Sequence, residues 1–370
     1  MAPSAVLLRR FISCGSSSSC CSAAGVAPAA VSVDATRKKT RLVFMGSPQV
    51  SALVLEKLSK VSEAPDSTFE LAAIVTQPPS ERNRGRKVLP SPVAQYALDR
   101  GFPKDLIFAP ERAGDERFLA DFKALKPEIC VTAAYGNILP NKFLEIPQCG
   151  VVNIHPSLLP LYRGAAPVQR ALQDGVKETG VSLAYTVRAL DAGPIIGYEK
   201  VEVDDHIKAP ELLEILFSKG SEILVREIPA ISDGSAKLKA QVQDDSEATL
   251  APKLKPEESW LSFDEEARVL HNKVRAFSGW PGTRAKLQVH DSNGSAKIIE
   301  FKIITTRFIS SCNTEDDENE IRFNKGALMI PCPGPSVLEV LEIQLPGKKV
   351  MTANDFWNGL RGQKLKKLIC

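Results

Sequence analysis

Four short apolar runs in the first half of the chain constrain its fold more than any other feature. The runs LVFMG, LAAIV, ICVTA and VVNIH lie within residues 40–46, 70–77, 128–136 and 149–156. Each has the length of a buried strand. Helical patterns at residues 47–60, 91–101 and 118–126 separate the first three. Strands that alternate with helices predict an α/β fold, with a doubly wound, mostly parallel sheet covered on both faces.

A dinucleotide is the most familiar ligand of such a sheet, but the first turn argues against one. The turn reads GSPQVS, with one glycine where the phosphate-binding fingerprint G-x-G-x-x-G needs three. Without the other glycines, the backbone cannot approach a pyrophosphate closely. We therefore expect no nucleotide cofactor.

The second half of the chain changes pattern twice. Residues 179–203 indicate two strands joined through RALDAGP, and residues 209–231 indicate a long helix with an apolar face. The polar stretch 232–255 is interpreted as a linker. Beyond it, a helix at 264–277 precedes short alternating segments that favour a small β-barrel. The predicted domains are therefore residues 40–231 and 256–370.

The first 39 residues have a different composition. They contain no acidic residue before Asp34, are rich in Ser and Ala, and place Leu7, Leu8 and Phe11 beside the first arginines. This pattern is typical of an organelle transit peptide. We expect import into mitochondria, with plastid or dual import as the alternative. A disordered Ser-rich tail without a targeting role is the competing interpretation.

Composition excludes several classes of function. The 370 residues carry a formal net charge of +3, so total charge does not indicate a nucleic-acid binder. The chain has 8 cysteines but no C-x-x-C pair, which predicts reduced thiols and no zinc site. No apolar stretch approaches the roughly 20 residues that a membrane span needs. We therefore expect neither a metal nor a membrane association.

The fourth apolar run leads into the most informative motif, NIHPSLLPLYRG, which begins at Asn153. Because side chains alternate along a strand, Asn153 and His155 point to the same face. They lie at the carboxyl end of a strand, where open α/β sheets bind ligands. Pro156 and Pro160 stiffen the loop that follows, so its backbone amides can be held in place.

This pair suits acyl transfer to an amine. The Asn153 amide can donate to the oxyanion, and the His155 imidazole can take the proton that the amine loses. Asp191, in the turn LDAGP, is the best candidate to orient the imidazole. The absence of a G-x-S-x-G motif argues against a serine nucleophile. The alternative is that His155 is a core histidine with satisfied hydrogen bonds.

A basic loop follows the second apolar run. The stretch SERNRGRKVLP contains four cations: Arg82, Arg84, Arg86 and Lys87. The loop leaves the same edge of the sheet as the Asn-His pair, and guanidinium groups can pair with phosphates. Most basic loops are only solvated, which is the alternative here.

In these motifs, the chain resembles the 10-formyltetrahydrofolate-dependent formyltransferases. NIHPSLLP with a downstream LDAGP is typical of that family. The runs SLLPLYRGAAPVQRAL, FMGSP, TQPPSERNRGRKVLPSPV, AAYGNILP and RAFSGWPGT are similar to its methionyl-tRNA formyltransferase branch. The resemblance extends over about residues 40–360. The turn DAGPII departs from that branch, which often has a threonine and an acidic residue there, and Pro156 stands where some relatives have glycine.

The resemblance implies roles for individual residues. Asn153 and His155 would stabilise the tetrahedral intermediate and shuttle its proton, and Asp191 would hold His155. The folate site would comprise Ser157, Leu158, Leu159 and Pro160, with Tyr135, Gly136, Asn137, Ile138 and Leu139 as the wall of a pterin pocket. The tRNA would be bound by Arg82, Arg84, Arg86 and Lys87, and by an oligonucleotide-binding-like (OB-like) barrel in the second domain.

The resemblance also implies an activity. The enzyme would transfer the formyl group of 10-formyltetrahydrofolate, its co-substrate, to the α-amine of methionine on initiator Met-tRNA for organellar translation initiation. It would need no metal or nucleotide, and we expect a monomer. One rival is another folate-dependent formyltransferase, or a formyl-folate hydrolase, acting on a small acceptor. The other is a non-catalytic RNA-binding protein, against which the presence of Asn153, His155 and Asp191 argues.

Overall fold

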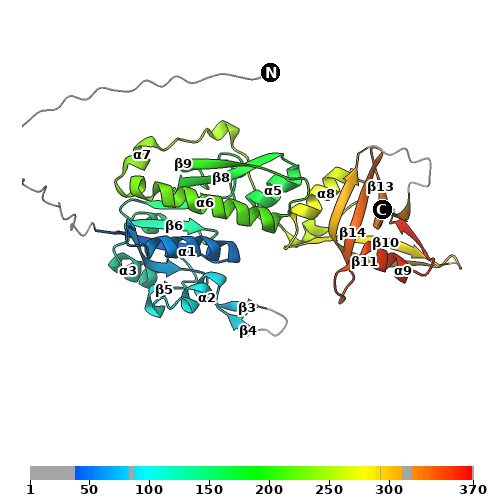
Figure 1. The fold of residues 1–370 in the computed structure, drawn as a ribbon, viewed down its shortest axis with the longest axis horizontal. Coiled ribbons are helices and arrows are strands. Elements are labelled where there is room, and N and C mark those ends of the chain that lie inside the picture. Colours follow the sequence, from blue (N-terminus) through cyan, green and yellow to red (C-terminus); the bar gives the residue numbers. More distant parts are fainter. Residues whose placement is uncertain (1–37, 83–86, 292, 311–318, 369–370) are drawn as a thin grey trace, which may run out of the picture. The chain divides into compact units, whose positions relative to one another are not determined.

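A computed structural model describes residues 38–82, 87–291, 293–310 and 319–368 (Figure 1). The predicted transit peptide lies outside these residues except for its last two positions, and so do Arg84 and Arg86 of the basic loop. Among the helices of the described ranges, none is long and apolar enough to cross a membrane.

The first domain is built on a seven-stranded sheet. In spatial order, its strands are β5 (Ile107–Phe108), β2 (Phe69–Val75), β1 (Thr40–Gly46), β6 (Ile129–Ala133), β7 (Val151–His155), β8 (Glu178–Tyr185) and β9 (Ile195–Glu202). The first five are parallel, whereas β8 runs antiparallel to both β7 and β9. The predicted mostly parallel sheet is therefore confirmed, with the four apolar runs as β1, β2, β6 and β7.

Helices cover both faces of this sheet (Figure 1). They are α1 (Gln49–Ser62), α2 (Pro92–Asp99), α3 (Glu116–Ala124), α4 (Asn141–Leu144), α5 (Pro167–Asp174), α6 (Ala209–Ser232) and α7 (Ser235–Lys239), with a short 3-10 helix, η1 (Lys104–Leu106). Alternation along β1 divides the core. Leu42 and Phe44 belong to the cluster that contains α1 and α6 side chains, and Val43 and Met45 belong to the one that contains α3. Burial on both faces explains why the strands are continuously apolar.

Residues 232–255, interpreted above as a linker, pack against the first domain. After α6 come α7 and a short 3-10 helix, η2 (Asp245–Glu247). Single β-bridges pair Gln241 with Ile195 and Leu250 with Arg163. The segment therefore contacts the loop that follows β7 and the start of β9.

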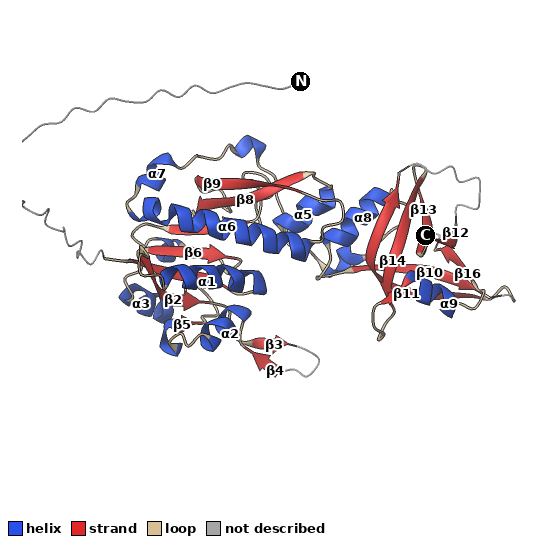
Figure 2. Cartoon of the chain, viewed as in Figure 1, coloured by secondary structure: helices blue, strands red, loops and turns tan. Residues whose placement is uncertain are grey.

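The second domain is a closed β-barrel, as predicted (Figure 2). Its ring consists of β11 (Ala296–Ile309), β10 (Thr283–His290), β16 (Lys364–Lys367), β12 (Glu320–Asn324), β13 (Ala327–Cys332) and β14 (Ser336–Gln344), and it closes through pairing of β14 with β11. The other elements are η3 (Pro256–Ser259), α8 (Ala267–Ala276), β15 (Met351–Thr352) and α9 (Ala353–Gly359). The sequence did not predict β12, β15, β16 or α9.

Side chains of α5 and α8 connect the two domains. His271 of α8 donates from Nε2 to Asp205 O at 2.8 Å, and its Nδ1 lies 2.9 Å from Thr306 Oγ1. Burial lowers the pKa of His271, which favours the neutral ring. Arg170 of α5 donates to both carboxylate oxygens of Glu258, at 2.7 and 3.1 Å.

Candidate active site

The end of β7 places two polar side chains on one face of the strand. Asn153 lies opposite Thr132 of β6, and its Oδ1 accepts a hydrogen bond from Thr132 Oγ1 at 2.8 Å. The Nδ2 group has no acceptor among the described residues. Asn153 therefore presents its donor end to the site, which is the end that an oxyanion would need.

His155 is almost fully buried, with 4% of its surface exposed. Its Nε2 lies 3.0 Å from Tyr162 O. Because a carbonyl oxygen can only accept, Nε2 carries the proton, and Nδ1 is the basic nitrogen of the neutral ring. Nδ1 lies 3.8 Å from Asp191 Oδ2. One ring nitrogen is thus held by the loop after β7, and the other can take a proton beside a carboxylate.

Asp191 lies in the connection between β8 and β9. Its φ is 46°, in the left-handed region that residues with a side chain rarely adopt. Its Oδ2 accepts a hydrogen bond from Gly164 N at 2.9 Å, which ties the carboxylate to the loop after β7. The structure therefore brings together the histidine and the aspartate that the sequence analysis paired.

Most backbone polar groups of the loop after β7 already make hydrogen bonds within the protein. Ser157 N donates to His155 O at 2.8 Å, and Leu159 N donates to Ser182 Oγ at 3.0 Å. Ser182 Oγ in turn donates to Ser157 O at 2.8 Å. Of the amides of Ser157, Leu158 and Leu159, Leu158 N alone has no acceptor within the described part of the chain. A ligand at this loop would therefore find one amide without a partner among the described residues.

The loop after β6 combines buried and exposed apolar side chains. Tyr135 is buried in the core cluster that contains the phenylalanines of α3 and α4, and burial raises the pKa of its hydroxyl. Leu139 packs against the same cluster, whereas Ile138 is 91% exposed. Of the apolar residues expected to wall a pterin pocket, Ile138 is free to contact a ligand, and the Tyr135 ring belongs to the core.

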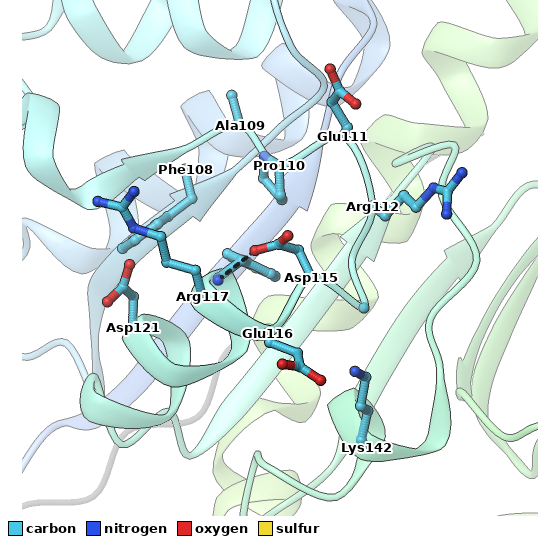
Figure 3. Close-up of a pocket in the computed structure, with 12 residues that line it drawn as sticks. Phe108, Ala109, Pro110, Glu111, Arg112, Asp115, Glu116, Arg117, Asp121 and Lys142 are labelled. Atoms are coloured by element: carbon cyan, nitrogen blue, oxygen red, sulfur yellow. Dashed lines mark hydrogen bonds between the residues drawn. The ribbon is translucent and has the colours of Figure 1, made fainter.

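A cavity of about 730 Å³ lies near this loop (Figure 3). It is joined to the loop by Asn137 Nδ2, which donates to Glu111 O at 3.3 Å. Its lining carries charges of both signs, on Arg112, Arg117, Lys142, Glu111, Asp115, Glu116 and Asp121. The lining does not include Asn153, His155 or Asp191, and the cavity borders β5, which three strands separate from β7. The cavity is therefore distinct from the catalytic group, and its mixed charge favours no particular ion.

The basic loop connects two short strands that the sequence did not predict. These are β3 (Ser80–Arg82) and β4 (Lys87–Leu89), which pair antiparallel. Lys87 is exposed, and Arg84 and Arg86 lie in the connection outside the described ranges. The hairpin follows β2, which is parallel to β1, β6 and β7 in the sheet. It therefore leaves the edge of the sheet that carries the Asn153–His155 motif.

Comparison with known proteins identifies the family. Residues 40–228 match the formyl transferase family, and residues 253–361 match the formyl transferase C-terminal domain. Methionyl-tRNA formyltransferases of Syntrophomonas wolfei and Thermotoga maritima are both 36% identical to the chain. These alignments cover 86% and 87% of this chain and 95% of each relative. The chain belongs to the methionyl-tRNA formyltransferase family.

A solved member of the wider formyltransferase fold supports the same architecture. It is an N-formyltransferase from Helicobacter canadensis in complex with folinic acid and dTDP-3-aminofucose. The TM-score is 0.55 at 16% identity, covering 81% of this chain and 98% of that chain. At this identity, the likeness concerns the fold alone.

The barrel of this formyltransferase carries an aromatic and basic cluster that the sequence analysis did not single out. The Trp260 ring is partly exposed, with Lys286 Nζ at 4.8 Å and Arg284 Cζ at 6.0 Å from its centroid. A base can stack on such a ring while the cations attract phosphates. The alternation in RAKLQVH indicated a strand there but not its proximity to Trp260.

Two buried polar residues of this formyltransferase were also missed. Arg163 and Gln243 are each 8% exposed and hydrogen-bonded to each other. Arg163 lies within the quoted run SLLPLYRG, so its position after β7 was a usable signal. Gln243 lies in the segment interpreted as a linker, where nothing in the local sequence indicated burial.

Proposed function

We propose that this chain transfers the formyl group of 10-formyltetrahydrofolate to the α-amine of methionine on initiator tRNA. The main observation behind this proposal is the arrangement at His155. Its Nδ1 lies 3.8 Å from the Asp191 carboxylate, and His155 shares β7 with Asn153. The relatives that share most of the chain are named methionyl-tRNA formyltransferases. The folinic acid bound to the Helicobacter canadensis protein supports a folate as the donor.

The proposed chemistry gives each side chain a separate task. The methionine nitrogen attacks the formyl carbon and forms a C–N bond, which moves an electron pair onto the formyl oxygen. Asn153 Nδ2 donates a hydrogen bond to this oxyanion. His155 Nδ1 takes the proton lost by the attacking nitrogen, and Asp191 stabilises the imidazolium. When the carbonyl re-forms, the bond from the formyl carbon to folate N10 breaks, and N10 receives the proton.

The two substrates would meet different surfaces of the molecule. The folate would lie against the loops after β6 and β7, where Ile138 is exposed and Leu158 N has no acceptor among the described residues. The tRNA would contact the basic loop between β3 and β4, and its acceptor arm would reach the barrel near Trp260. The cations on both surfaces support this assignment, because phosphate contacts supply most of the affinity for nucleic acids.

Formyl transfer from labelled 10-formyltetrahydrofolate tests the proposal. We expect label on initiator Met-tRNA, with much less on elongator Met-tRNA and none on free methionine. Release of labelled formate without tRNA would favour a formyl-folate hydrolase. Equal labelling of free methionine would favour a transferase for small acceptors. Either outcome would overturn the proposal.

Residues 1–39 are the basis of a proposed organellar location. We propose that they direct import into mitochondria, because they lack acidic residues before Asp34 and place arginines beside a short apolar patch. A reporter fused to residues 1–39 should enter mitochondria. Plastid or dual import would correct the compartment, and a cytosolic reporter would contradict the proposal. We also propose that the enzyme acts as a monomer, which sedimentation at micromolar concentration would check.

A further inference from the structure

We propose that Gln243 is a positioning residue for Asp191, so that the segment after α6 forms part of the active site. This inference rests on the proposed function, because it concerns the carboxylate that would support His155. Within the described part of the chain, Gln243 makes no hydrogen bond to His155. It would act only by fixing the conformation of the β8–β9 connection.

The contacts of Gln243 span that connection. Its Nε2 donates to Asp191 O at 2.8 Å and to Gly193 O at 2.7 Å. Both hydrogens of the amide are therefore used on backbone carbonyls on either side of Ala192. A side chain that binds two carbonyls of one turn restricts the turn to a single conformation.

Arg163 fixes the orientation of this amide. The Gln243 Oε1 accepts from Arg163 Nε at 3.0 Å and from Arg163 Nη2 at 2.8 Å. Because a guanidinium can only donate, it must face the amide oxygen, and Nε2 must face Asp191 and Gly193. Arg163 Nη2 also donates to Asp245 Oδ1 at 2.7 Å, which holds the guanidinium from the same segment.

The neighbours of Arg163 in sequence contact the two catalytic candidates directly. Tyr162 O accepts from His155 Nε2, and Gly164 N donates to Asp191 Oδ2. The Arg163–Gln243 pair therefore joins the loop that holds His155 to the connection that holds Asp191. The relative position of the two catalytic groups depends on this pair.

The backbone of the same segment supports the loop after β7. Arg163 N donates to Thr249 O at 2.8 Å, and Ala251 N donates to Arg163 O at 2.7 Å. The approach is close, because a Cβ added at Gly164 would lie 2.6 Å from Ala251 O. Gln243 is thus presented by a segment that is itself anchored at the site.

The conformation of Asp191 explains why such support is needed. Asp191 has a φ of 46°, in the left-handed region that costs most residues with a side chain about 1–2 kcal/mol and aspartate less, so contacts around the turn help to hold it there. The 3.8 Å from Asp191 Oδ2 to His155 Nδ1 exceeds a hydrogen-bond length, so a shift of the turn changes whether the carboxylate reaches the imidazole. Displacements of about 1 Å can cost on the order of 10²-fold in rate.

Kinetics of Gln243→Met test the positioning role. Methionine has a similar length but donates no hydrogen bond, so we expect kcat to fall by about 10- to 10²-fold while KM for the folate changes little. Gln243→Glu keeps the acceptor for Arg163 and loses both donations, so it should also lower kcat. The matched control is Gln241→Ala, in the same segment, because Gln241 is exposed and, among the described residues, makes hydrogen bonds through its backbone alone. It should retain the wild-type rate.

A double-mutant cycle separates this role from a general structural one. If Gln243 acts through Asp191, Gln243→Met should cost little further activity in an Asp191→Asn background. If the folded double variant loses as much activity as the two single losses multiplied together, the inference is overturned. A wild-type kcat in both Gln243→Met and Gln243→Glu would also overturn it.

A crystal structure of Gln243→Met provides a readout that needs no substrate. The Asp191 carboxylate should lie farther from His155 Nδ1 than the 3.8 Å of the wild type. An unchanged separation would overturn the inference. A wild-type enzyme that fails to formylate Met-tRNA would overturn the proposed function, and this structure would still test Gln243.

Discussion

The two parts of the candidate active site are held by different means. Asn153 and His155 lie on β7, where register with β6 on one side and β8 on the other determines the face to which they point. Asp191 lies in a turn with a positive φ, and the contacts that hold it come from Gly164 and Gln243, 27 and 52 positions away.

This difference indicates how each part should respond to substitution. A side chain on a central strand can be removed without moving its neighbours, because backbone hydrogen bonds of the sheet fix the strand. A strained turn depends on side chains that contact it. Substitutions on β7 should therefore act mainly by removing chemistry, although His155→Ala also removes the bond to Tyr162 O, whereas substitutions around the turn should act through geometry.

The largest effects are expected on β7. His155→Ala should lower the single-turnover rate by about 10²–10⁴-fold, because it removes the proton acceptor. Asn153→Ala should lower it by about 10²–10³-fold, because it removes the oxyanion donor. Binding of both substrates should persist, measured by separate titrations with folate and with Met-tRNA. A near wild-type rate in His155→Ala would show that His155 is only a core histidine.

The next prediction concerns cooperation between the two parts. Asp191→Asn keeps the size of the side chain but loses the charge that supports the imidazolium, so we expect a loss of about 10²-fold. Because the two groups act as a unit, His155→Ala/Asp191→Asn should be little slower than the slower single variant. Single-turnover rates of the four proteins complete the cycle. Independent, multiplying losses would mean that Asp191 does not act through His155.

The contrast between elements fixed by a local pattern and parts held by distant contacts also explains how much of the fold the sequence predicted. Elements with a strong local pattern were predicted correctly, such as β7 and the long helix α6. The strands β3, β4 and β16 were missed, since three or four residues are too few to show a period. Residues 232–255 were interpreted as a linker because they are polar. Gln243, however, is a buried polar residue, and its amide donates to two backbone carbonyl groups.

The candidate site also divides into residues that a local pattern positions and residues that tertiary contacts position. The Asn153–His155 pair was visible because strand periodicity is local. Asp191 was visible only as part of a turn, and its contact with Gly164 depends on tertiary folding that the local pattern does not contain. The ring of Tyr135, one of the residues expected to wall a pterin pocket, lies in the core cluster that contains the phenylalanines of α3.

The basic loop provides a contrast with both β7 and the Asp191 turn, because it would bind the tRNA and take no part in the chemistry. Arg84→Ala should lower kcat/KM for Met-tRNA through loss of one charged contact, which is about 1–3 kcal/mol. Folate affinity should be unchanged, and the defect should shrink at higher salt, where the wild type loses the same contact. The matched control is Lys57→Ala on α1, an exposed cation outside the loop. A fall in folate affinity with normal tRNA kinetics would contradict the assignment.

The smallest expected effect lies far from both parts of the site, at His271. Burial lowers its pKa, so the folded protein keeps the ring neutral while the unfolded chain takes up a proton below about pH 6.5. This contribution to the free energy of unfolding is fully present above pH 6.5 and is lost as the pH falls toward the folded pKa. The variant His271→Gln does not titrate at this position, and its amide can replace the bond to Asp205 O, so we expect a loss of about 1–2 kcal/mol in the free energy of unfolding at pH 7.5.

Denaturant unfolding at pH 7.5 and 5.5 measures this contribution. The difference in free energy of unfolding between the wild type and His271→Gln should be smaller at pH 5.5. His290→Gln, on β10, is the control, because His290 is not among the groups that shift the pKa of His271. A gap independent of pH would show that His271 is not the titrating group.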